Sequence, residues 1–501
     1  MSDRAATPLR GGLRRLVTET AVYGLGGIAN QALTIVLVPV YARQLGVENY
    51  GVLAVLNTVL ALTTMVVGLA MPQGFFRWYL KESENEQQRA HVLATTLSLR
   101  LAASLAGLIA FSLLAPLLGL ALFGGTGELP IILLIGPITF FDTLNLIPLS
   151  FLRGERRPVP YSVLAFTRAA LGSVLIIVFV VVLDMGVMGV LLGSAISALV
   201  SVVFGLGIMA RADRLRLGWD RSHAVALLRF TLPLVPAALA GWTLSLSDRF
   251  VIGAVDGYRA VGVYAIGYTV GLAMNALVVQ PFTLAWGAAY WEYARDEAQA
   301  PRTIARTMTL FAIVAGIPAL GLSLFGTDAI RLLLTPEFEP GRFVVPFSAF
   351  GYLAYGLYMI SGTGLNLVSR TRWIPLTVGA AALANLVINL VTIPLFGFMA
   401  AAWSTLISYA LLAILTGAAS QRYYPVPWDY PRVLGAVGLG LALSAAGLLG
   451  PDALAWRILC FLVFPVVLLA TGIVSRVDAV RLATWAGNLP ARLSGSSERV
   501  P

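Results

Sequence analysis

The sequence is poor in charged residues and has hardly any lysine, histidine or cysteine. Charged residues make up 12% of it, whereas soluble proteins have about a quarter, so a soluble globular protein is excluded. Lys81 is the one lysine, so the chain has no Gly-Lys-Ser/Thr motif and no P-loop for nucleotide phosphates. The lone Cys460 allows no intrachain disulfide and is expected to be a small packing residue. His91 and His223 lack the neighbouring ligands of a zinc site, so we expect no cofactor.

Apolar residues dominate the chain instead. They make up 58% of the sequence, and the mean hydropathy is +0.85. Apolar runs of about 20 residues recur from end to end, and a helix of that length crosses a hydrocarbon core of about 30 Å. The two-residue alternation of membrane β-strands is absent, so the spans must satisfy their backbone hydrogen bonds as helices. The sequence therefore predicts an all-α polytopic membrane protein with about 14 transmembrane helices.

An internal repeat relates the two halves of the chain at an offset of 211 positions. The residues Gly46, Gly51, Val52, Ala54, Thr58 and Val59 recur without a gap as Gly257, Gly262, Val263, Ala265, Thr269 and Val270. A second window has the same offset, in which Gly186, Met188, Ile196 and Ser197 recur as Gly397, Met399, Ile407 and Ser408. Two separate windows that share one offset indicate a tandem duplication.

The repeat predicts how the chain is divided. Two six-helix lobes are expected at residues 1–209 and 230–420. The polar segment 210–229 between them is expected to lie along the cytoplasmic membrane interface as a linker. An extra helix pair, helices 13 and 14, occupies residues 421–475, and a cytoplasmic tail is expected at 476–501.

The distribution of arginine predicts the orientation. Most of the 34 Lys and Arg residues lie in the N-terminal segment, in alternate connections and in the C-terminal tail. The opposite side has only Arg43, Arg259, Arg331, Arg342 and Arg457. This asymmetry places both termini in the cytoplasm, so the net charge of +10 reflects topology and not nucleic-acid binding. Six helices separate the copies, so the repeat is parallel, as in transporters whose two lobes flank a central site.

Two stretches resemble the signatures of a known family. The segment 41–53 resembles the first-loop signature of polysaccharide (O-antigen type) flippases. Residues 247–253 and 261–264 are similar to that family's seventh-to-eighth-helix signature. These proteins form the polysaccharide transporter branch of the multidrug/oligosaccharidyl-lipid/polysaccharide exporter superfamily. The lipid II flippase branch has the same helix count, but its arginine-rich first-helix signature is not found here.

The resemblance implies a carrier in a bacterial inner membrane. Its substrate would be an undecaprenyl-diphosphate-linked oligosaccharide, such as an O-antigen, capsule or exopolysaccharide repeat unit. Alternating access between the two lobes would move this lipid from the cytoplasmic to the outer leaflet. Membrane lipids and the polysaccharide polymerase complex are the further partners that the resemblance implies, and no nucleic acid is expected.

Three charged residues inside the spans of the first lobe are candidates for binding the diphosphate. Charges within a span are costly and mark functional sites by default. Arg100, Arg168 and Asp142 fall at a similar depth, roughly 12–14 Å from the cytoplasmic face. A guanidinium can bind two phosphate oxygens at once, so Arg100 and Arg168 suit the diphosphate, with Asp142 moderating their charge. The alternative is that Asp142 pairs with one arginine as a structural bridge between helices.

Two further charged positions are candidates. Asp248 and Arg249 lie towards the outer end of a span. Arg249 would hold the diphosphate in the outward-open state, or Asp248 would be a proton site that couples transport to the proton-motive force. The alternative is a pair that fixes the helix end, with Arg249 extending to water or lipid phosphate. Arg77 would collect substrate at the cytoplasmic mouth or, alternatively, anchor the chain by the positive-inside rule.

Sugar hydroxyls require amide and hydroxyl partners, which the spans contain. The candidates for binding the oligosaccharide include Asn30, Gln31, Asn57 and Asn145. Each amide has an equally simple alternative role, because amides within membranes also form hydrogen bonds between helices.

Two other functions stay open at this point. A cation-coupled multidrug extruder of the same superfamily typically has a buried carboxylate deep in its first or seventh helix. Here the first span has only Glu19 at its edge, and Asp248 lies far towards the outside. A membrane sugar-transferring enzyme, or a scaffold for one, would need carboxylates on an outer loop, where Glu337 and Glu339 are the only close pair. The flippase is therefore the leading interpretation.

Overall fold

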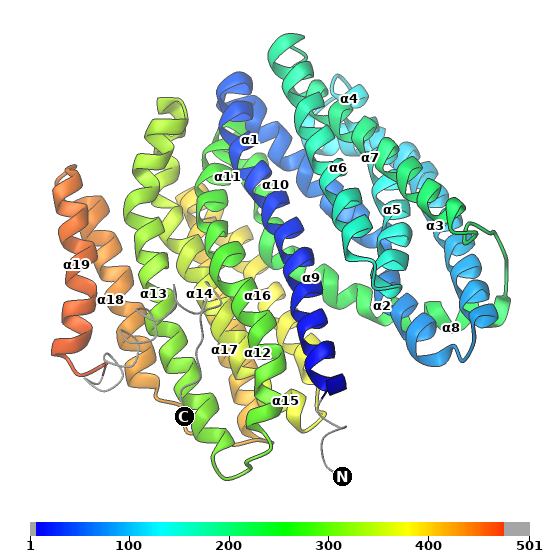
Figure 1. Ribbon diagram of the computed structural model, residues 1–501. Coiled ribbons are helices and arrows are strands. Elements are labelled where there is room, and N and C mark those ends of the chain that lie inside the picture. The colour runs from blue at the N-terminus through cyan, green and yellow to red at the C-terminus, as the bar shows by residue number, and fades with distance from the viewer. Residues whose placement is uncertain (1–6, 475–501) are drawn as a thin grey trace, which may run out of the picture. The chain divides into compact units, whose positions relative to one another are not determined.

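The structure, a computed structural model, describes residues 7–474, with side chains from Leu37 onward. All regular structure in this range is helical, which confirms the predicted all-α class. The helices of Figure 1 are α1 (Thr7–Gly68), α2 (Met71–Phe76), α3 (Glu86–Phe123), α4 (Leu129–Leu133), α5 (Ile135–Gly154), α6 (Pro158–Ile177), α7 (Gly186–Arg211), α8 (Arg221–Thr231), α9 (Val235–Leu246), α10 (Asp248–Val255), α11 (Gly257–Met274), α12 (Gln280–Tyr293), α13 (Ala300–Leu333), α14 (Val345–Ser361), α15 (Thr363–Leu367), α16 (Trp373–Phe396), α17 (Phe398–Gln421), α18 (Tyr430–Leu449) and α19 (Leu454–Ala470). The predicted tail at 476–501 lies outside the described residues.

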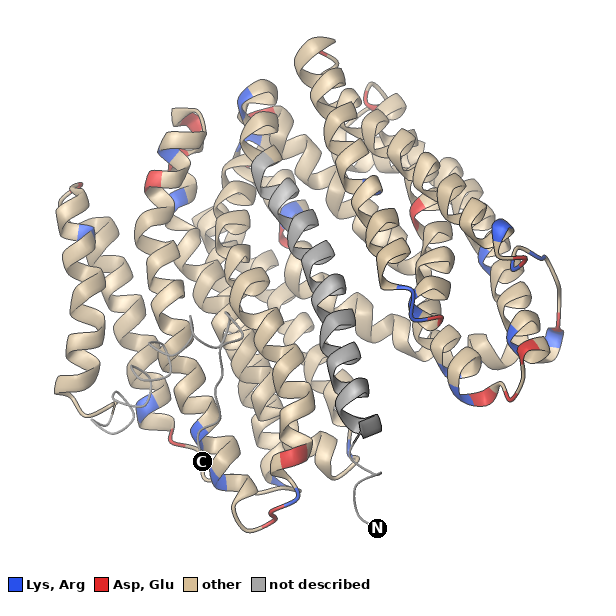
Figure 2. Cartoon of the chain, viewed as in Figure 1, with Lys and Arg blue, Asp and Glu red and all other residues tan. Residues whose placement is uncertain are grey.

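Most of these helices are long and apolar. Within the described residues, eleven can cross a membrane, or twelve if Pro336–Phe343 and Val345–Leu367 form one bent span. The apolar helix α19 is shorter. Figure 2 shows the charged residues mainly near helix ends, with long uncharged stretches between them. The protein is therefore a multi-pass membrane protein, as predicted, while the total of about 14 spans stays a prediction.

Glycines related by the repeat have a positive φ at both turns. Gly46 kinks α1 with a φ of 73°, and its counterpart Gly257 begins α11 with a φ of 81°. Gly186 begins α7 with a φ of 55°, and its counterpart Gly397 separates α16 from α17 with a φ of 65°. Glycine adopts positive φ at little cost because it has no Cβ. The positive φ at both pairs agrees with the duplication that the sequence predicts.

The two repeat copies also meet each other directly. A Cβ on Gly51 in α1 would lie 1.8 Å from the carbonyl oxygen of Tyr258 in α11. A Cβ on Gly262 in α11 would lie 2.0 Å from the carbonyl oxygen of Val47 in α1. Val47 and Tyr258 are repeat counterparts, as are Gly51 and Gly262, so the contact is reciprocal. Only glycine lets two helix backbones approach so closely.

The described chain divides into two compact units, and α11, α13, α16 and α17 contribute residues to both. Unit 1 runs to Ala265 and includes Leu333–Phe338 and Ala382–Ala401. In unit 1, α5, α6 and α7 pack side by side, with α1 and α3 against them (Figure 1). Two apolar clusters form its core, one containing Leu56, Ile138 and Val190 and the other Phe75, Phe151 and Met209.

Unit 2 contains Ile266–Leu332, Glu339–Ala381 and the chain from Ala402 onward. In this unit α18 and α19 pack as a pair, and their apolar residues join α13 in one cluster. Cys460 belongs to that cluster and is 4% exposed, which agrees with its expected role as a small packing residue. The predicted boundaries of the lobes, the linker and the helix pair stay predictions.

The segment expected as a linker at 210–229 contains the first helix of the next span. α8 begins after Asp220, whose Oδ1 accepts hydrogen bonds from the backbone N–H groups of Ser222 (2.8 Å) and His223 (3.2 Å). These bonds satisfy N–H groups that the first turn of a helix leaves unpaired. α8 continues through a short 3-10 turn into α9, so the candidate span runs from Arg221 to Leu246. The candidate span therefore includes residues of the predicted linker, and the helix breaks at Ser247 before α10.

Candidate functional site

A polar layer crosses α5, α6 and α7 in unit 1. Arg168 of α6 binds Asp142 of α5 with two hydrogen bonds, from Nε to Oδ1 at 3.0 Å and from Nη2 to Oδ2 at 3.2 Å. Its Nη1 donates a third bond to Ser197 Oγ of α7 at 2.6 Å. The Arg168 and Asp142 side chains are 24% and 29% exposed, so the pair is neither sealed off nor fully solvated. The sequence allowed a bridge between Asp142 and one arginine, and the structure shows that bridge with Arg168.

Neutral polar groups continue this layer along α5 and α7. Asn145 Nδ2 donates to Ser201 Oγ at 2.9 Å, and Asn145 is buried. Thr143 shares a hydrogen bond of 2.9 Å with Ser104 of α3. Asn145 therefore forms a hydrogen bond between helices in this conformation. This is the alternative role that the sequence left open for each amide. Its Oδ1 is buried without a partner among the described groups, so it keeps one acceptor for a water or a hydroxyl.

Arg100 of α3 does not contact the Asp142–Arg168 pair. It is fully buried, and it donates from Nη1 to the carbonyl of Val67 at 3.0 Å and from Nη2 to that of Gly68 at 2.7 Å. These carbonyls end α1, where Leu69 and Ala70 leave the helix with positive φ of 50° and 48°. The last carbonyls of a helix have no helical partners, so Arg100 caps this end. A role for Arg100 in binding the diphosphate stays a prediction.

A second charge pair lies in unit 1, where the helix breaks between α9 and α10. Asp248 Oδ1 accepts a bond of 2.9 Å from Arg249 Nη1, and Oδ2 accepts one from the hydroxyl of Tyr264 in α11. Arg249 Nη1 also donates to the carbonyl of Ser245 at 3.0 Å. Asp248 and Arg249 are only 2% and 6% exposed. The pair of the alternative interpretation is therefore present, but Arg249 does not extend to water or lipid phosphate. Its guanidinium carbon lies 5.6 Å from the centre of the Tyr264 ring, inside the protein.

The other candidates are placed differently. The Arg77 side chain is 47% exposed, lies 3.6 Å from Glu82, and stacks over the rings of Trp78 and Phe230 at 5.2 and 5.0 Å. Asn57 is exposed on α1, within the candidate span from Leu37 to Glu82. The side chains of Asn30 and Gln31 lie outside the described part of the chain, so their roles stay predictions.

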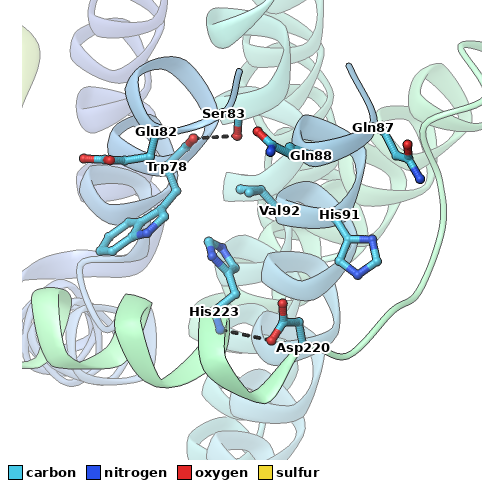
Figure 3. Close-up of a pocket in the computed structure, with 9 residues that line it drawn as sticks. All are labelled: Trp78, Glu82, Ser83, Gln87, Gln88, His91, Val92, Asp220 and His223. Atoms are coloured by element: carbon cyan, nitrogen blue, oxygen red, sulfur yellow. Dashed lines mark hydrogen bonds between the residues drawn. The ribbon is translucent and has the colours of Figure 1, made fainter. Parts of the chain in front are cut away.

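Unit 1 also has a cavity of about 400 Å³ where α3 begins, and sequence analysis did not anticipate it. Its polar lining comprises the carboxylates of Glu82 and Asp220, the amides of Gln87 and Gln88, and the imidazoles of His91 and His223 (Figure 3). Trp78 forms one wall, and its ring meets that of His223 edge-on with centroids 5.8 Å apart. His223 Nε2 is buried without a partner among the described groups. This set both donates and accepts hydrogen bonds, as sugar hydroxyls require.

Asp220 stays charged at the rim of this cavity. The Ser222 hydroxyl and the backbone N–H of His223 hold the pKa of the Asp220 carboxyl below its usual range. The carboxylate also lies at the N-terminus of α8, where the helix dipole favours negative charge. At neutral pH the cavity therefore has a fixed acceptor at Asp220, next to the imidazole of His223.

Several residues at these sites were not predicted as site residues, and three of them make contacts used above. They are Ser197, Tyr264 and His223. Ser197 belongs to the second repeat window and Tyr264 to the family signature, so sequence patterns marked both positions. These patterns could not show that Ser197 forms a hydrogen bond with Arg168, or Tyr264 with Asp248, because each bond joins residues of different helices.

Comparison with known proteins identifies the family. The sequence model of a family described as "Polysaccharide biosynthesis protein" matches residues 40–341, more than half of the chain. This range includes both stretches that carry the resemblance. A Haloferax volcanii protein named "Probable low-salt glycan biosynthesis flippase Agl15" is 21% identical over 214 residues, which cover 42% of this chain and 45% of that protein. The chain therefore aligns with less than half the length of this relative.

Solved structures show the same fold. The lipid II flippase MurJ in an inward closed conformation has a TM-score of 0.68 at 16% identity, over 91% of this chain and 100% of that one. An inward-facing multidrug resistance MATE family transporter has a TM-score of 0.61 at 14% identity, over 80% and 93% of the two chains. A mutant of the Vibrio cholerae MATE transporter VcmN has a TM-score of 0.56 at 14% identity, over 82% and 96%.

These named relatives are flippases and transporters, which agrees with the expected class of protein. The family match covers both signature stretches, the repeat turn at Gly46 and the Asp142–Arg168 pair. The chain belongs to the family described as "Polysaccharide biosynthesis protein".

Proposed function

We propose that the protein moves an undecaprenyl-diphosphate-linked oligosaccharide from the cytoplasmic to the outer leaflet of a bacterial inner membrane by alternating access. The observation that carries this proposal is the Asp142–Arg168 pair, a partly exposed charge pair inside the apolar spans of a flippase-family protein. The glycan flippase of Haloferax volcanii supports a glycan as the cargo.

The proposed cargo makes a specific physical demand. Its diphosphate and sugars cannot cross hydrocarbon unaided, so the carrier must provide a wet path with cationic and hydrogen-bonding groups. Arg168 presents a planar fork of N–H groups, and Asp142 neutralises it while the carrier is empty. In the loaded state the diphosphate would replace Asp142 at this fork, while Ser197 keeps the guanidinium in place.

Asn57 is a second element of the proposed path. Its side chain is exposed within a membrane span, where an amide facing hydrocarbon would lose its hydrogen bonds with water. An exposed amide at this depth is better satisfied by a water-filled path, where it can bind sugar hydroxyls. Asn57→Leu should therefore slow translocation without lowering the melting temperature, and an unchanged rate would remove Asn57 from the path.

Arg168→Ala is expected to lower translocation of the lipid-linked oligosaccharide by about 10- to 100-fold. Hydrogen bonds to charged groups contribute about 1.5–3 kcal/mol, and this substitution removes those that Arg168 makes to the diphosphate. Asp142→Asn should retain or raise the rate, because it keeps the shape of the side chain but releases Arg168 from its carboxylate. The measurement is the rate at which glycan appears in the opposite leaflet of proteoliposomes, at matched amounts of folded protein.

The two substitutions separate binding from structure. If Arg168→Ala and Asp142→Asn lowered the translocation rate equally and also lowered the melting temperature equally, the pair would be only a structural bridge. Arg100→Ala is the companion variant, expected to lower the melting temperature because it uncaps α1. A loss of translocation by Arg100→Ala at an unchanged melting temperature would instead place Arg100 in the binding site.

We place sugar residues of the same cargo in the cavity beside Trp78. His223→Phe keeps the ring packing against Trp78 but removes the buried Nε2. A neutral hydrogen bond contributes about 1 kcal/mol, so the KM for translocation should rise about fivefold while kcat is unchanged. An unchanged KM together with a lower melting temperature would assign His223 to packing alone.

A cation-coupled multidrug extruder is the second candidate, because MATE transporters share the fold and Asp248 is a buried carboxylate. The same proteoliposomes decide between the two. Export of a cationic dye without glycan translocation would replace the flippase proposal. In that case Asp248→Asn should abolish dye efflux, because it removes the proposed proton site.

The orientation and the partners belong to the same proposal. The arginine asymmetry supports cytoplasmic termini, and the resemblance supports association with the polysaccharide polymerase complex. Epitope tags at the two termini should react with antibody only after the inner membrane is permeabilised. Reaction in intact spheroplasts would reverse the orientation.

A further inference from the structure

Unit 2 has a cavity of about 350 Å³ that the proposed function does not use. It lies where the first turns of α13 meet the segment that leads into α18. Figure 2 shows basic residues on both of these helix ends. All of its lining residues belong to unit 2, whereas the proposed cargo contacts belong to unit 1.

Three arginines line this cavity. Arg302 and Arg306 lie one helical turn apart on α13 and are both exposed, and Arg432 lies in the first turn of α18. Asp429 is the acidic residue of the lining, with its Oδ2 lying 3.3 Å from Arg432 Nε. Its Oδ1 accepts the backbone N–H of Arg432 at 3.3 Å and so caps α18. The lining therefore contains three arginines and one aspartate.

These arginines lie at the ends of apolar spans. No charged residue follows Arg306 in α13 before Asp328, and none follows Arg432 in α18. Because charges stop where the hydrocarbon begins, the cavity lies at the level of the lipid head groups. Its wall deeper in the span includes Leu310 and Ile313 and is apolar. The cavity therefore combines a cationic mouth with an apolar base.

An exposed apolar stripe leads from the cavity along α13. Leu310 lines the cavity, and Val314 and Ile317 follow it on the same helical face. Val314 is 44% exposed and Ile317 is 39% exposed. The stripe would contact an acyl chain that hangs below a head group in the cavity. A soluble anion has no acyl chain and would not contact this stripe.

We propose that this cavity binds the phosphate of an anionic phospholipid through Arg302, Arg306 and Arg432, with an acyl chain along α13. Each arginine near a lipid phosphate strengthens its binding about fivefold. The site concerns the surrounding bilayer and not the cargo, so it goes beyond the proposed transport function. Binding of the phospholipid at this cavity does not depend on whether the cargo is a glycan.

The test uses the full-length protein in phosphatidylcholine nanodiscs with graded amounts of phosphatidylglycerol. Native mass spectrometry counts the phosphatidylglycerol molecules that the protein retains. The wild type should retain phosphatidylglycerol in preference to phosphatidylcholine, and the double variant Arg302→Gln/Arg306→Gln should bind it about 25-fold more weakly. Arg295→Gln is the matched control, because Arg295 is exposed on the connection before α13 but does not line the cavity. It should change binding by less than about twofold.

Asp429→Asn should have the opposite effect. Asparagine keeps a side-chain carbonyl that can cap α18 but removes the negative charge beside Arg432. Binding of phosphatidylglycerol should therefore rise about fivefold. A damaged fold does not produce a gain in binding, so this variant separates the effect of charge from that of misfolding.

Several outcomes would overturn the site. They are the absence of any preference for phosphatidylglycerol in the wild type, a loss in Arg295→Gln equal to that in the double variant, and weaker binding by Asp429→Asn. Competition by inorganic phosphate alone would show a site for a free anion. Preferred retention of undecaprenyl diphosphate would assign the cavity to a cargo-type lipid. None of these measurements depends on translocation, so failure here and failure of the proposed function can be told apart.

Discussion

Gly262→Ala is expected to prevent most of the protein from folding. The new Cβ would lie 2.0 Å from the carbonyl oxygen of Val47, far inside van der Waals contact. The obstacle is backbone and cannot rotate away, so α1 and α11 would have to separate along their crossing. Overpacking of this kind costs about 3 kcal/mol or more. The measurement is the fraction of monodisperse protein in fluorescence-detected size-exclusion chromatography, together with its melting temperature.

The repeat provides a second variant and the chain provides a control. Gly51→Ala should have a similar effect, because its Cβ would lie 1.8 Å from the carbonyl oxygen of Tyr258. Gly207→Ala in α7 should be neutral or slightly stabilising, because no atom lies within 4 Å of its added Cβ and alanine favours the helix. Folding of Gly262→Ala at the level of Gly207→Ala would show that the close crossing is not required.

Asp248→Ala is expected to have the second largest effect on stability. It removes the carboxylate from Arg249, whose side chain is 7% exposed, and it also removes the acceptor of the Tyr264 hydroxyl. Removing one partner of a buried ion pair costs about 3–5 kcal/mol, because the other charge stays buried without compensation. The melting temperature of the purified protein should fall by several degrees, and the yield of folded protein should fall with it.

The double variant Asp248→Asn/Arg249→Gln tests this explanation. It removes both charges but keeps side chains that can form hydrogen bonds, so it should be more stable than Asp248→Ala. Arg249 also donates to the carbonyl of Ser245, and glutamine can replace that bond only if it reaches the same position. A double variant that is as unstable as Asp248→Ala would show that shape and hydrogen bonding matter here more than charge.

The membrane character and the glycines at the turns could be predicted well. Within a bilayer the backbone has no water to bind, so long apolar segments form helices regardless of what packs against them. The glycines that turn the chain could also be found, because Gly46 and Gly257 occupy matching places in the repeat. Their positive φ follows from the absence of a Cβ, which is a local property of the residue.

The partners of the charged residues could not be predicted in the same way. Position along a span gives the depth of a residue but not the direction in which its side chain points. Arg100 and Arg168 were therefore assigned to one depth, yet Arg168 binds Asp142 while Arg100 caps α1. Arg249 lies over the ring of Tyr264, which comes from the next helix.

The same distinction applies to the two cavities. The cavity beside Trp78 needs the start of α3 and the start of α8, which lie more than a hundred positions apart in the sequence. The arginine-lined cavity in unit 2 likewise joins Arg306 to Arg432. By itself the sequence determined the helices, the repeat and the family, because these depend on local hydropathy, local backbone freedom and matching residue types. The tertiary structure alone decided which charges meet and where cavities form, because both depend on how helices rotate and pack against each other.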